Sequence, residues 1–115
     1  MMVIYKMFDF MLIQGFDWDA GNDRKSRDKH AVSRLESEQV FFNKPLLLIP
    51  DTPHSIDEER IHAFGVTDNG RLLHISFTLR ENKTLIRIIS ARPMSREERQ
   101  HFAESQKNTL LQNGS

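Results

Sequence analysis

Apolar and polar residues alternate along three strand-length runs in the second half of the chain, at 60–66, 71–80 and 84–92. Alternation of this kind is typical of strands that bury one face. Two turn sequences separate the runs. The first contains Asn69-Gly70, a strong hairpin signal because both residues tolerate positive φ, and the second is Glu81-Asn82-Lys83. The pattern predicts a three-stranded antiparallel meander around which the rest of the fold is organised.

The same alternation sorts the meander into two faces. One face is expected to be apolar and to pack on helices, with Leu73, Ile75, Phe77 and Leu79 from the middle run. The other face is expected to be polar and collects Arg60, His62, His74, Ser76, Thr78 and Arg80. In the third run Arg87 and Arg92 have opposite parity, so alternation leaves open which of them joins the polar face.

The first half of the chain begins with a short strand followed by a helix. Phe16 and Trp18 alternate with acidic residues, which predicts an edge strand over 16–19 with both aromatic side chains facing inward. Asp19 is placed to cap a polar surface helix over 20–30.

A second helix is predicted from Ser33 onward, because Ser33 and Glu36 have capping-box spacing. Its buried stripe is expected to contain Leu35, Val40 and Phe41. An apolar strand over 46–49 follows and is closed by Pro50, and the Pro-containing stretch 51–57 is expected to be a loop.

At the C-terminal end, Ser95 is expected to cap a helix with Glu97 and Glu98 in its first turn. The helix is predicted to run to about residue 105 and to pack through Phe102 and Ala103, with 106–115 as a flexible tail. The predicted fold class is α+β. A small antiparallel sheet, made of the meander and short N-terminal strands, is flanked by two N-terminal helices and one C-terminal helix.

The composition fits one globular domain, since the chain has 115 residues of which 38% are hydrophobic and 28% charged. The domain is expected to span 12–105, with 1–11 as an N-terminal extension or leader. The chain has no cysteine, which excludes disulfides, a thiolate nucleophile and Cys-based zinc sites. Its apolar runs are too short to cross a membrane, and a cytoplasmic location is expected.

A zero net charge conceals an uneven distribution. Residues 1–59 hold seven Lys/Arg and eleven Asp/Glu, whereas residues 60–99 hold eight and four. Seven of the eight basic residues in 60–99 are arginines, whose guanidinium groups match phosphates and carboxylates. The charge distribution allows a local basic patch on the meander, which would suit nucleic acid, and equally a solvated sheet face.

Few residues have the spacing that catalytic motifs require. The five histidines do not form a zinc pattern, and the sequence contains neither a Gly-rich phosphate loop nor a nucleophile elbow. No metal and no cofactor are expected. Asp51 and His54 could supply an acid–base pair beside Arg60, but they fit equally a turn-capping role in a loop.

Several blocks of the sequence, taken in order, resemble the BrnT family of ribonuclease toxins from bacterial type II toxin–antitoxin systems. The resemblance extends from about Phe16 to Phe102. Its most specific blocks are His54-Ser55-Ile56-Asp57-Glu58-Glu59-Arg60 and Ile86-Arg87-Ile88-Ile89-Ser90-Ala91-Arg92. Further matches are Trp18-Asp19, Lys29-His30, Val40-Phe41, Phe64-Gly65, Gly70-Arg71, Thr78-Leu79-Arg80 and Glu98-Arg99.

The resemblance implies a small RelE-like fold and an endoribonuclease that cleaves RNA and blocks translation. It also implies neutralisation by a ribbon-helix-helix antitoxin (BrnA-like), with operator DNA bound only through the complex. Asn22, Ser26, Ala31 and the stretch 34–37 depart from the family pattern. These departures weaken a catalytic role for the first helix, leave Lys29, His30 and Glu36 as its candidates, and are compatible with reduced or lost activity.

RNA cleavage by an adjacent 2′-hydroxyl requires a base, an acid and a cationic clamp, whereas a metal is optional. The hypothetical catalytic residues are Arg60, Arg80, His54, Glu59 and Lys29. The residues expected to contact RNA are Trp18, His62, His74, Arg87 and Arg92. A second hypothesis is a non-catalytic binding module that acts with the antitoxin as a transcriptional corepressor.

Overall fold

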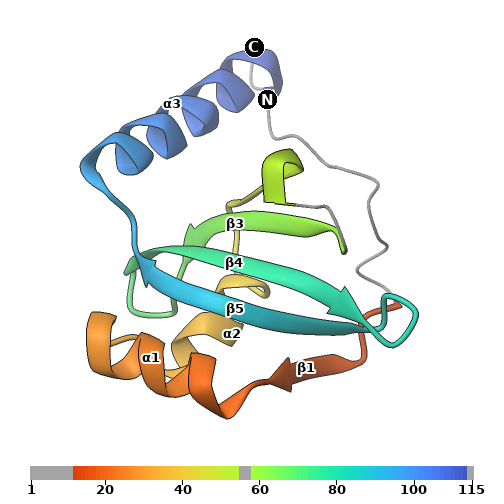
Figure 1. Ribbon diagram of the computed structural model, residues 1–115. Coiled ribbons are helices and arrows are strands. Elements are labelled where there is room, and N and C mark those ends of the chain that lie inside the picture. The colour runs from red at the N-terminus through yellow and green to blue at the C-terminus, as the bar shows by residue number, and fades with distance from the viewer. Residues whose placement is uncertain (1–11, 55–57, 114–115) are drawn as a thin grey trace.

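The predicted meander forms the centre of a five-stranded sheet in the computed structural model (Figure 1). The structure describes residues 12–54 and 58–113. Its strands are β1 (Gly15–Trp18), β2 (Leu46–Pro50), β3 (Arg60–Val66), β4 (Leu72–Arg80) and β5 (Leu85–Pro93). Its helices are α1 (Ala20–His30), α2 (Arg34–Val40), the short 3₁₀ helix η2 (Thr52–His54) and α3 (Arg96–Asn113). The predicted α+β class is confirmed.

The strand order is β1-β5-β4-β3-β2, so β1 lies at an edge as expected. Strands β2 to β5 pair antiparallel, whereas β1 runs parallel to β5. A parallel pair needs a long crossover connection, and here most of the chain lies between the two strands. Only four residues of β1 take part, from Gly15 opposite Leu85 to Trp18 opposite Ile88.

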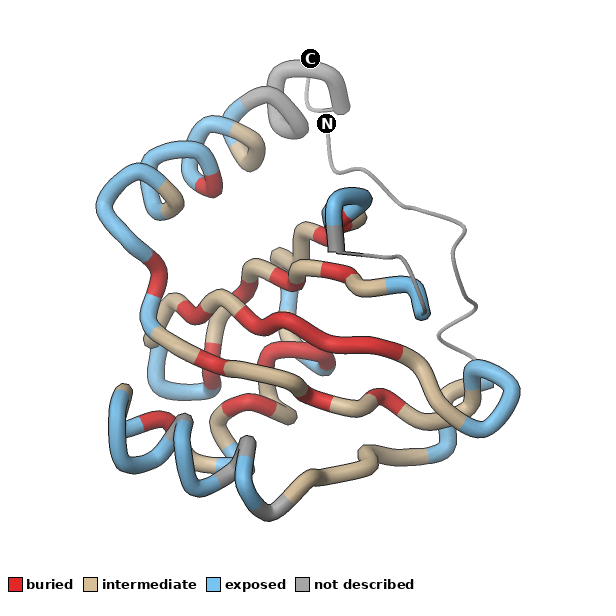
Figure 2. Tube along the Cα trace, viewed as in Figure 1, coloured by how far each residue is buried: buried red, intermediate tan, exposed pale blue. Residues whose placement is uncertain are grey.

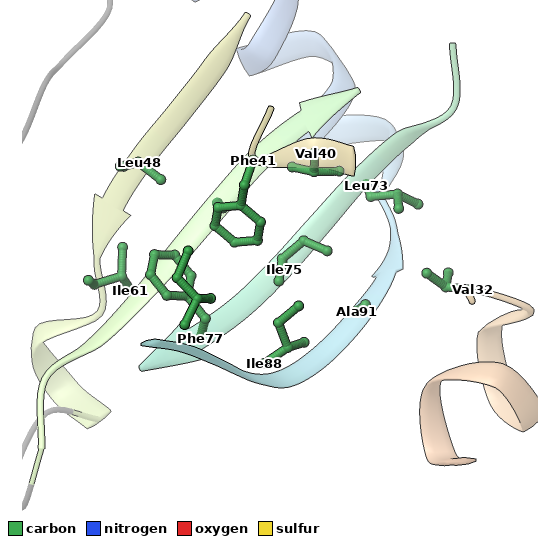
Figure 3. Close-up of a cluster of buried hydrophobic side chains, with 12 residues drawn as sticks. Val32, Val40, Phe41, Leu48, Ile61, Leu73, Ile75, Phe77, Ile88 and Ala91 are labelled. Atoms are coloured by element: carbon green, nitrogen blue, oxygen red, sulfur yellow. The ribbon is translucent and has the colours of Figure 1, made fainter. Parts of the chain in front are cut away.

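The hydrophobic core lies between one face of the sheet and the helices α1 and α2 (Figures 1 and 3). Helix α1 contacts β5, and α2 contacts β3 and β4. The side chains of Ile61, Ile75, Phe77 and Ile88 are completely buried there. Helix α2 approaches β3 so closely that a Cβ on Gly65 would lie 2.7 Å from Val40 Cγ1. The expected apolar face is therefore confirmed, and Gly65 permits its tightest contact.

The other face carries the polar side chains that alternation had collected, and we call it the polar face. A β-bulge extends it to both arginines of β5. Ser76 pairs with Ser90 but Phe77 pairs with Ile88, so Ile89 has no partner. The extra residue reverses the parity of β5 at that point. As a result Arg87 lies opposite Thr78 and Arg92 lies opposite His74, and both belong to the polar face.

Helix boundaries and helix burial differ from the predictions in two places. Helix α2 has the expected capping box at Ser33, but Leu35 is 66% exposed and Ser37 is buried in its place. Two residues along a helix are about 200° apart, so Leu35 and Ser37 necessarily face opposite sides. Helix α3 continues to Asn113 because Gly114 is the first helix breaker after Ser95, so the predicted end near residue 105 was wrong.

Burial follows this layered arrangement (Figure 2). The middle of the sheet is buried, whereas α1 and α3 are mostly exposed. Helix α3 begins on the polar-face side of the sheet and buries Phe102, as predicted, but Ala103 is exposed. Within the described residues, no helix is both long enough and apolar enough to cross a membrane. The predicted leader 1–11 lies outside the described residues, and the domain limits at 12 and 105 stay predictions.

Candidate functional site on the polar face

Three arginines surround Thr78 at the end of the meander where β3 and β5 begin and β4 ends. Arg60 on β3 and Arg87 on β5 lie directly opposite Thr78, and Arg80 is two residues further along β4. Directly opposed Cβ atoms in such a sheet are about 5 Å apart. Thr78 is buried and its Oγ1 donates a 2.8 Å hydrogen bond to the Glu59 carbonyl, which fixes the start of β3 against β4. The register therefore places three guanidinium side chains on one patch.

Carboxylates lie around this patch. Arg80 Nη2 lies 3.1 Å from Glu58 Oε1 at a site where both side chains are more than one-third exposed. Arg87 Nη2 lies 3.3 Å from Asp19 Oδ2, and Nη1 lies 3.9 Å from Asp17 Oδ2. Exposed ion pairs of this kind contribute roughly 0–1 kcal/mol, so an incoming anion can replace the carboxylates at little cost. Arg80 Nε is buried and has no hydrogen-bond partner among the described residues.

Two histidines lie side by side further along the same face. His62 Nδ1 is 2.7 Å from His74 Nε2 and 3.2 Å from Ser76 Oγ. His62 Nε2 is 3.1 Å from Asp51 Oδ2, and Phe64 stacks on the His74 ring at 4.5 Å. Burial, followed by the positive charge of Arg92, lowers the pKa of His74 from 6.5 to about 4. His74 is therefore uncharged at neutral pH.

Arg92 is engaged with the first turn of α3. Its two terminal nitrogens each donate a 2.8 Å hydrogen bond to Glu98, one to Oε1 and the other to Oε2. The Ser95 amide also donates to Glu98 Oε1, and Ser95 Oγ accepts from the Glu98 amide. Burial opposes ionisation of Glu98, but the hydrogen bonds from Arg92 and Ser95 outweigh it and lower the Glu98 pKa to about 2. Arg92 thus joins α3 to the sheet.

The structure separates Trp18 and Lys29 from the other predicted site residues. Trp18 packs against the core, its Nε1 donates to Glu38 Oε2 at 2.8 Å, and the Arg34 guanidinium lies 5.1 Å from its ring centroid. Lys29 is exposed in α1, which covers the apolar face. Glu59 is exposed immediately before β3, beside the arginine patch. His54 ends η2, and its side chain lies outside the described part of the chain.

Two contacts were not predicted from the sequence. The first is that Asp51 Oδ2 lies 3.1 Å from His62 Nε2. The pairing of Ile49 with His62 places Asp51 just beyond the end of the β2–β3 ladder, but this register is not visible in the sequence.

The second unpredicted contact involves Arg71, which donates to both oxygens of Glu36 and to the carbonyls of Ala31 and His30. Burial opposes ionisation of Glu36, while the Ser33 amide and Arg71 lower its pKa. Glu36 and Arg71 therefore hold the junction between α1 and α2.

A concave region of about 440 Å³ lies on the helix side of the sheet. Its lining is mostly apolar and consists of Ile13, Gln14, Gly15, Phe41, Phe42 and Ile86. Among the described residues, its lining contains no ionisable side chain. In the described ranges, no set of three or more His, Asp or Glu residues has the arrangement of a metal site. The candidate site is therefore the polar face.

The protein is therefore of the α+β class, with helices α1 and α2 packed on one face of the sheet. The opposite face presents arginine and histidine side chains. Residues 18–98 match the family model described as the ribonuclease toxin, BrnT, of type II toxin–antitoxin systems. Because this match spans well over half of the chain, the protein belongs to that family.

A solved structure has the same fold. The crystal structure of the Brucella abortus ribonuclease toxin BrnT, at 1.1 Å resolution, matches with a TM-score of 0.54 and 19% sequence identity. The match covers 71% of this chain and 97% of the Brucella chain. No curated protein sequence matches. The family of type II toxins implies that a protein antitoxin is a partner.

Proposed function

We propose that this chain is an endoribonuclease whose active site is the arginine patch of the polar face. The observation that carries this proposal is the convergence of Arg60, Arg80 and Arg87 around buried Thr78. A phosphate diester carries one negative charge, and the transition state of its cleavage concentrates additional charge on the non-bridging oxygens. Guanidinium groups fixed by neighbouring strands are suited to stabilising that charge.

In this mechanism Arg60 and Arg80 bind the scissile phosphate, and Arg87 supports them from β5. A base removes the proton from the 2′-hydroxyl, whose oxygen attacks phosphorus, and an acid protonates the leaving 5′-oxygen. Glu59 or His54 fills one of these roles, because both are close in sequence to Arg60 at the start of β3. The reaction needs no metal. His62, His74 and Arg92 lie further along the same face and would contact the flanking RNA.

Lys29 and Trp18 have no direct part in this proposal. Both lie on the helix side of the sheet, whereas Arg60 and Arg80 lie on the polar face. We further propose that the protein blocks translation by cleaving RNA in the cytoplasm. A ribbon-helix-helix antitoxin would neutralise it and bring the complex to operator DNA.

One observation favours the alternative, a corepressor without catalysis. Carboxylates contact three of the polar-face arginines, with Glu58 at Arg80, Asp19 at Arg87 and Glu98 at Arg92. A face neutralised in this way would suit a protein partner. Expression without the antitoxin distinguishes the two functions. Only a ribonuclease would then arrest growth and degrade RNA.

The test is induced expression of the chain without antitoxin, followed by growth and by the integrity of cellular RNA. Arg60→Ala and Arg80→Ala should each restore growth. With purified protein, each should slow cleavage of an oligoribonucleotide by roughly 10²- to 10³-fold, the effect of removing one transition-state donor. Cleavage by the unsubstituted chain should persist in excess EDTA.

The matched control is Arg24→Ala, which removes the same charge from exposed α1 on the other side of the sheet. It should leave growth arrest and cleavage unchanged. Circular dichroism and thermal unfolding of all three variants establish that they fold. Full toxicity of both Arg60→Ala and Arg80→Ala would refute the assignment of the site, and intact RNA with normal growth for the unsubstituted chain would favour the corepressor.

A further inference from the structure

A row of four titratable side chains crosses the polar face from the end of β2 to the first turn of α3. Asp51 Oδ2 is 3.1 Å from His62 Nε2, His62 Nδ1 is 2.7 Å from His74 Nε2, and His74 Nδ1 is 3.4 Å from Glu98 Oε2. The row thus has a carboxylate at each end and two imidazole rings between them. Its side chains are 9% to 26% exposed.

Counting protons shows that one contact in this row lacks a hydrogen when both imidazole rings are uncharged. Each of its three contacts requires one hydrogen on a ring nitrogen, because an ionised carboxylate only accepts. Two neutral imidazoles carry two such hydrogens, so one contact lacks its proton. The structure identifies which one: His74 Nδ1 is buried without a hydrogen-bond partner among the described residues, and its contact with Glu98 is the longest of the three.

We infer that the Asp51–His62–His74–Glu98 row binds one further proton as a unit, shared between the two imidazole rings. In the protonated row, His62 donates from Nε2 to Asp51 and from Nδ1 to His74 Nε2. His74 then holds its own hydrogen on Nδ1 and donates it to Glu98. All three contacts are satisfied by this single proton. Ser76 Oγ, 3.2 Å from His62 Nδ1, accepts a share of the same hydrogen.

In this arrangement His62 is the ring with a hydrogen on both nitrogens, and the hydrogen on its Nδ1 is the one shared with His74. This ring is 26% exposed compared with 11% for His74, and it lies beside the carboxylate of Asp51. His74 is a poorer place for the charge, because burial and then Arg92 lower its pKa to about 4. The other charged side chains that the strands bring to this face are Arg60 on β3, Arg80 on β4, and Arg87 and Arg92 on β5, and α3 adds Glu98. A second proton, on His74 itself, binds only in stronger acid.

Proton uptake makes the polar face more positive. If the face binds RNA, a point that rests on the proposed function, mild acid should strengthen that binding. One additional cation at a partly exposed site corresponds to about a five-fold change in affinity. The proton site itself can be tested without RNA.

The direct test is ¹⁵N NMR of the imidazole nitrogens of the full chain, titrated from about pH 8 to about pH 5, above the range in which His74 binds a second proton. The expected result is that His62 and His74 respond together with one shared midpoint, and that His74 Nδ1 gains its hydrogen in this transition. Two separate midpoints would overturn the inference. So would a His74 that already carries its hydrogen on Nδ1 at the alkaline end.

A pair of variants provides the matched comparison. In Glu98→Gln, the side-chain amide can donate to His74 Nδ1, which satisfies the contact without the extra proton, so the shared midpoint should fall by about one pH unit. Glu97→Gln removes the same charge from an exposed position of the same turn and should leave the midpoint nearly unchanged. Equal shifts in both variants would overturn the inference. Asp51→Asn tests the other end of the row, through the same measurement of the shared midpoint.

The RNA arm uses a 2′-O-methyl oligonucleotide, which cannot be cleaved. Its Kd should fall about five-fold from pH 7.5 to pH 5.5 for the unsubstituted chain and for Glu97→Gln, but less for Glu98→Gln. A joint histidine titration with no RNA binding at either pH would sustain the proton site and refute the proposed function. RNA binding that is equally strong at both pH values would refute the claim that proton uptake by the row strengthens RNA binding.

Discussion

The two faces of the sheet are built from neighbouring residues of the same strands, yet they differ in what their side chains contact. On the apolar face, Ile61, Ile75 and Phe77 alternate with polar-face residues and bury their side chains completely in the core beneath α2. On the polar face, most contacts are hydrogen bonds and ion pairs, and the arginines keep much of their surface in solvent. Stability should therefore depend mainly on one face and function mainly on the other.

The largest effect that this comparison predicts is on the apolar face. Phe77 is fully buried, and its ring meets that of Phe41 edge-on at 5.1 Å. Phe77→Ala removes a large apolar side chain and leaves a cavity, so the free energy of unfolding should fall by about 3–5 kcal/mol. Urea or guanidinium titration measures this change.

Phe42→Ala is the matched control, because Phe42 is 78% exposed and touches Phe16 only at the edge of its ring. It should cost less than about 1 kcal/mol. A similar loss for both variants would break the comparison, since it would mean that the concave region beside Phe42 contributes as much as the core.

An intermediate effect is expected on the polar face, as a dependence of stability on pH. The His74 pKa is about 4 in the folded protein and 6.5 ordinarily, so between these values the unfolded chain binds more protons. Stability is then complete above about pH 6.5 and is lost as the pH falls towards 4. The difference between these two pKa values corresponds to about 3–4 kcal/mol.

His74→Gln should remove most of this pH dependence, and denaturant titrations at pH 7 and pH 4 would measure it. The control His101→Gln changes an exposed histidine of α3 and should leave the dependence in place. An unchanged slope in His74→Gln would show that the polar face contributes nothing to acid sensitivity.

The smallest effect is expected at α2, which closes the apolar face. Ser33→Ala removes a capping box in which Ser33 and Glu36 satisfy each other's amides, and should cost about 1 kcal/mol in unfolding free energy. Leu35→Ser, at an exposed position of the same helix, should change it by less than about 0.5 kcal/mol. A greater loss in Leu35→Ser would indicate that the outer ridge of α2 has a structural contact of its own.

Local signals predicted much of the fold. The bounds of α1, the capping box of α2 and the hairpin at Asn69-Gly70 all follow from short stretches of sequence, and the structure confirms them. Long-range features were not accessible in the same way. The parallel pairing of β1 with β5 joins segments about seventy residues apart, and no local pattern encodes it.

The candidate site was predicted only in outline. Alternation placed Arg60, His62, His74 and Arg80 on one face, because period two is a local property of a strand. It failed for β5, where the extra residue Ile89 reverses parity and brings both Arg87 and Arg92 to that face. Trp18 and Lys29 were grouped with the site by resemblance alone, and tertiary packing places them on the helix side.

The β-bulge at Ile89 has a consequence for how this sequence tolerates insertions and deletions. Strand β5 consists of two halves with opposite phase, and one unpaired residue maintains the offset between them. Deleting a residue near Ile89 would shift one half of β5 by one residue relative to β4. Its side chains would then exchange faces, and either Arg87 or Arg92 would point towards the core. In a chimera, the number of residues between Arg87 and Arg92 would therefore have to be kept for both arginines to lie on the polar face.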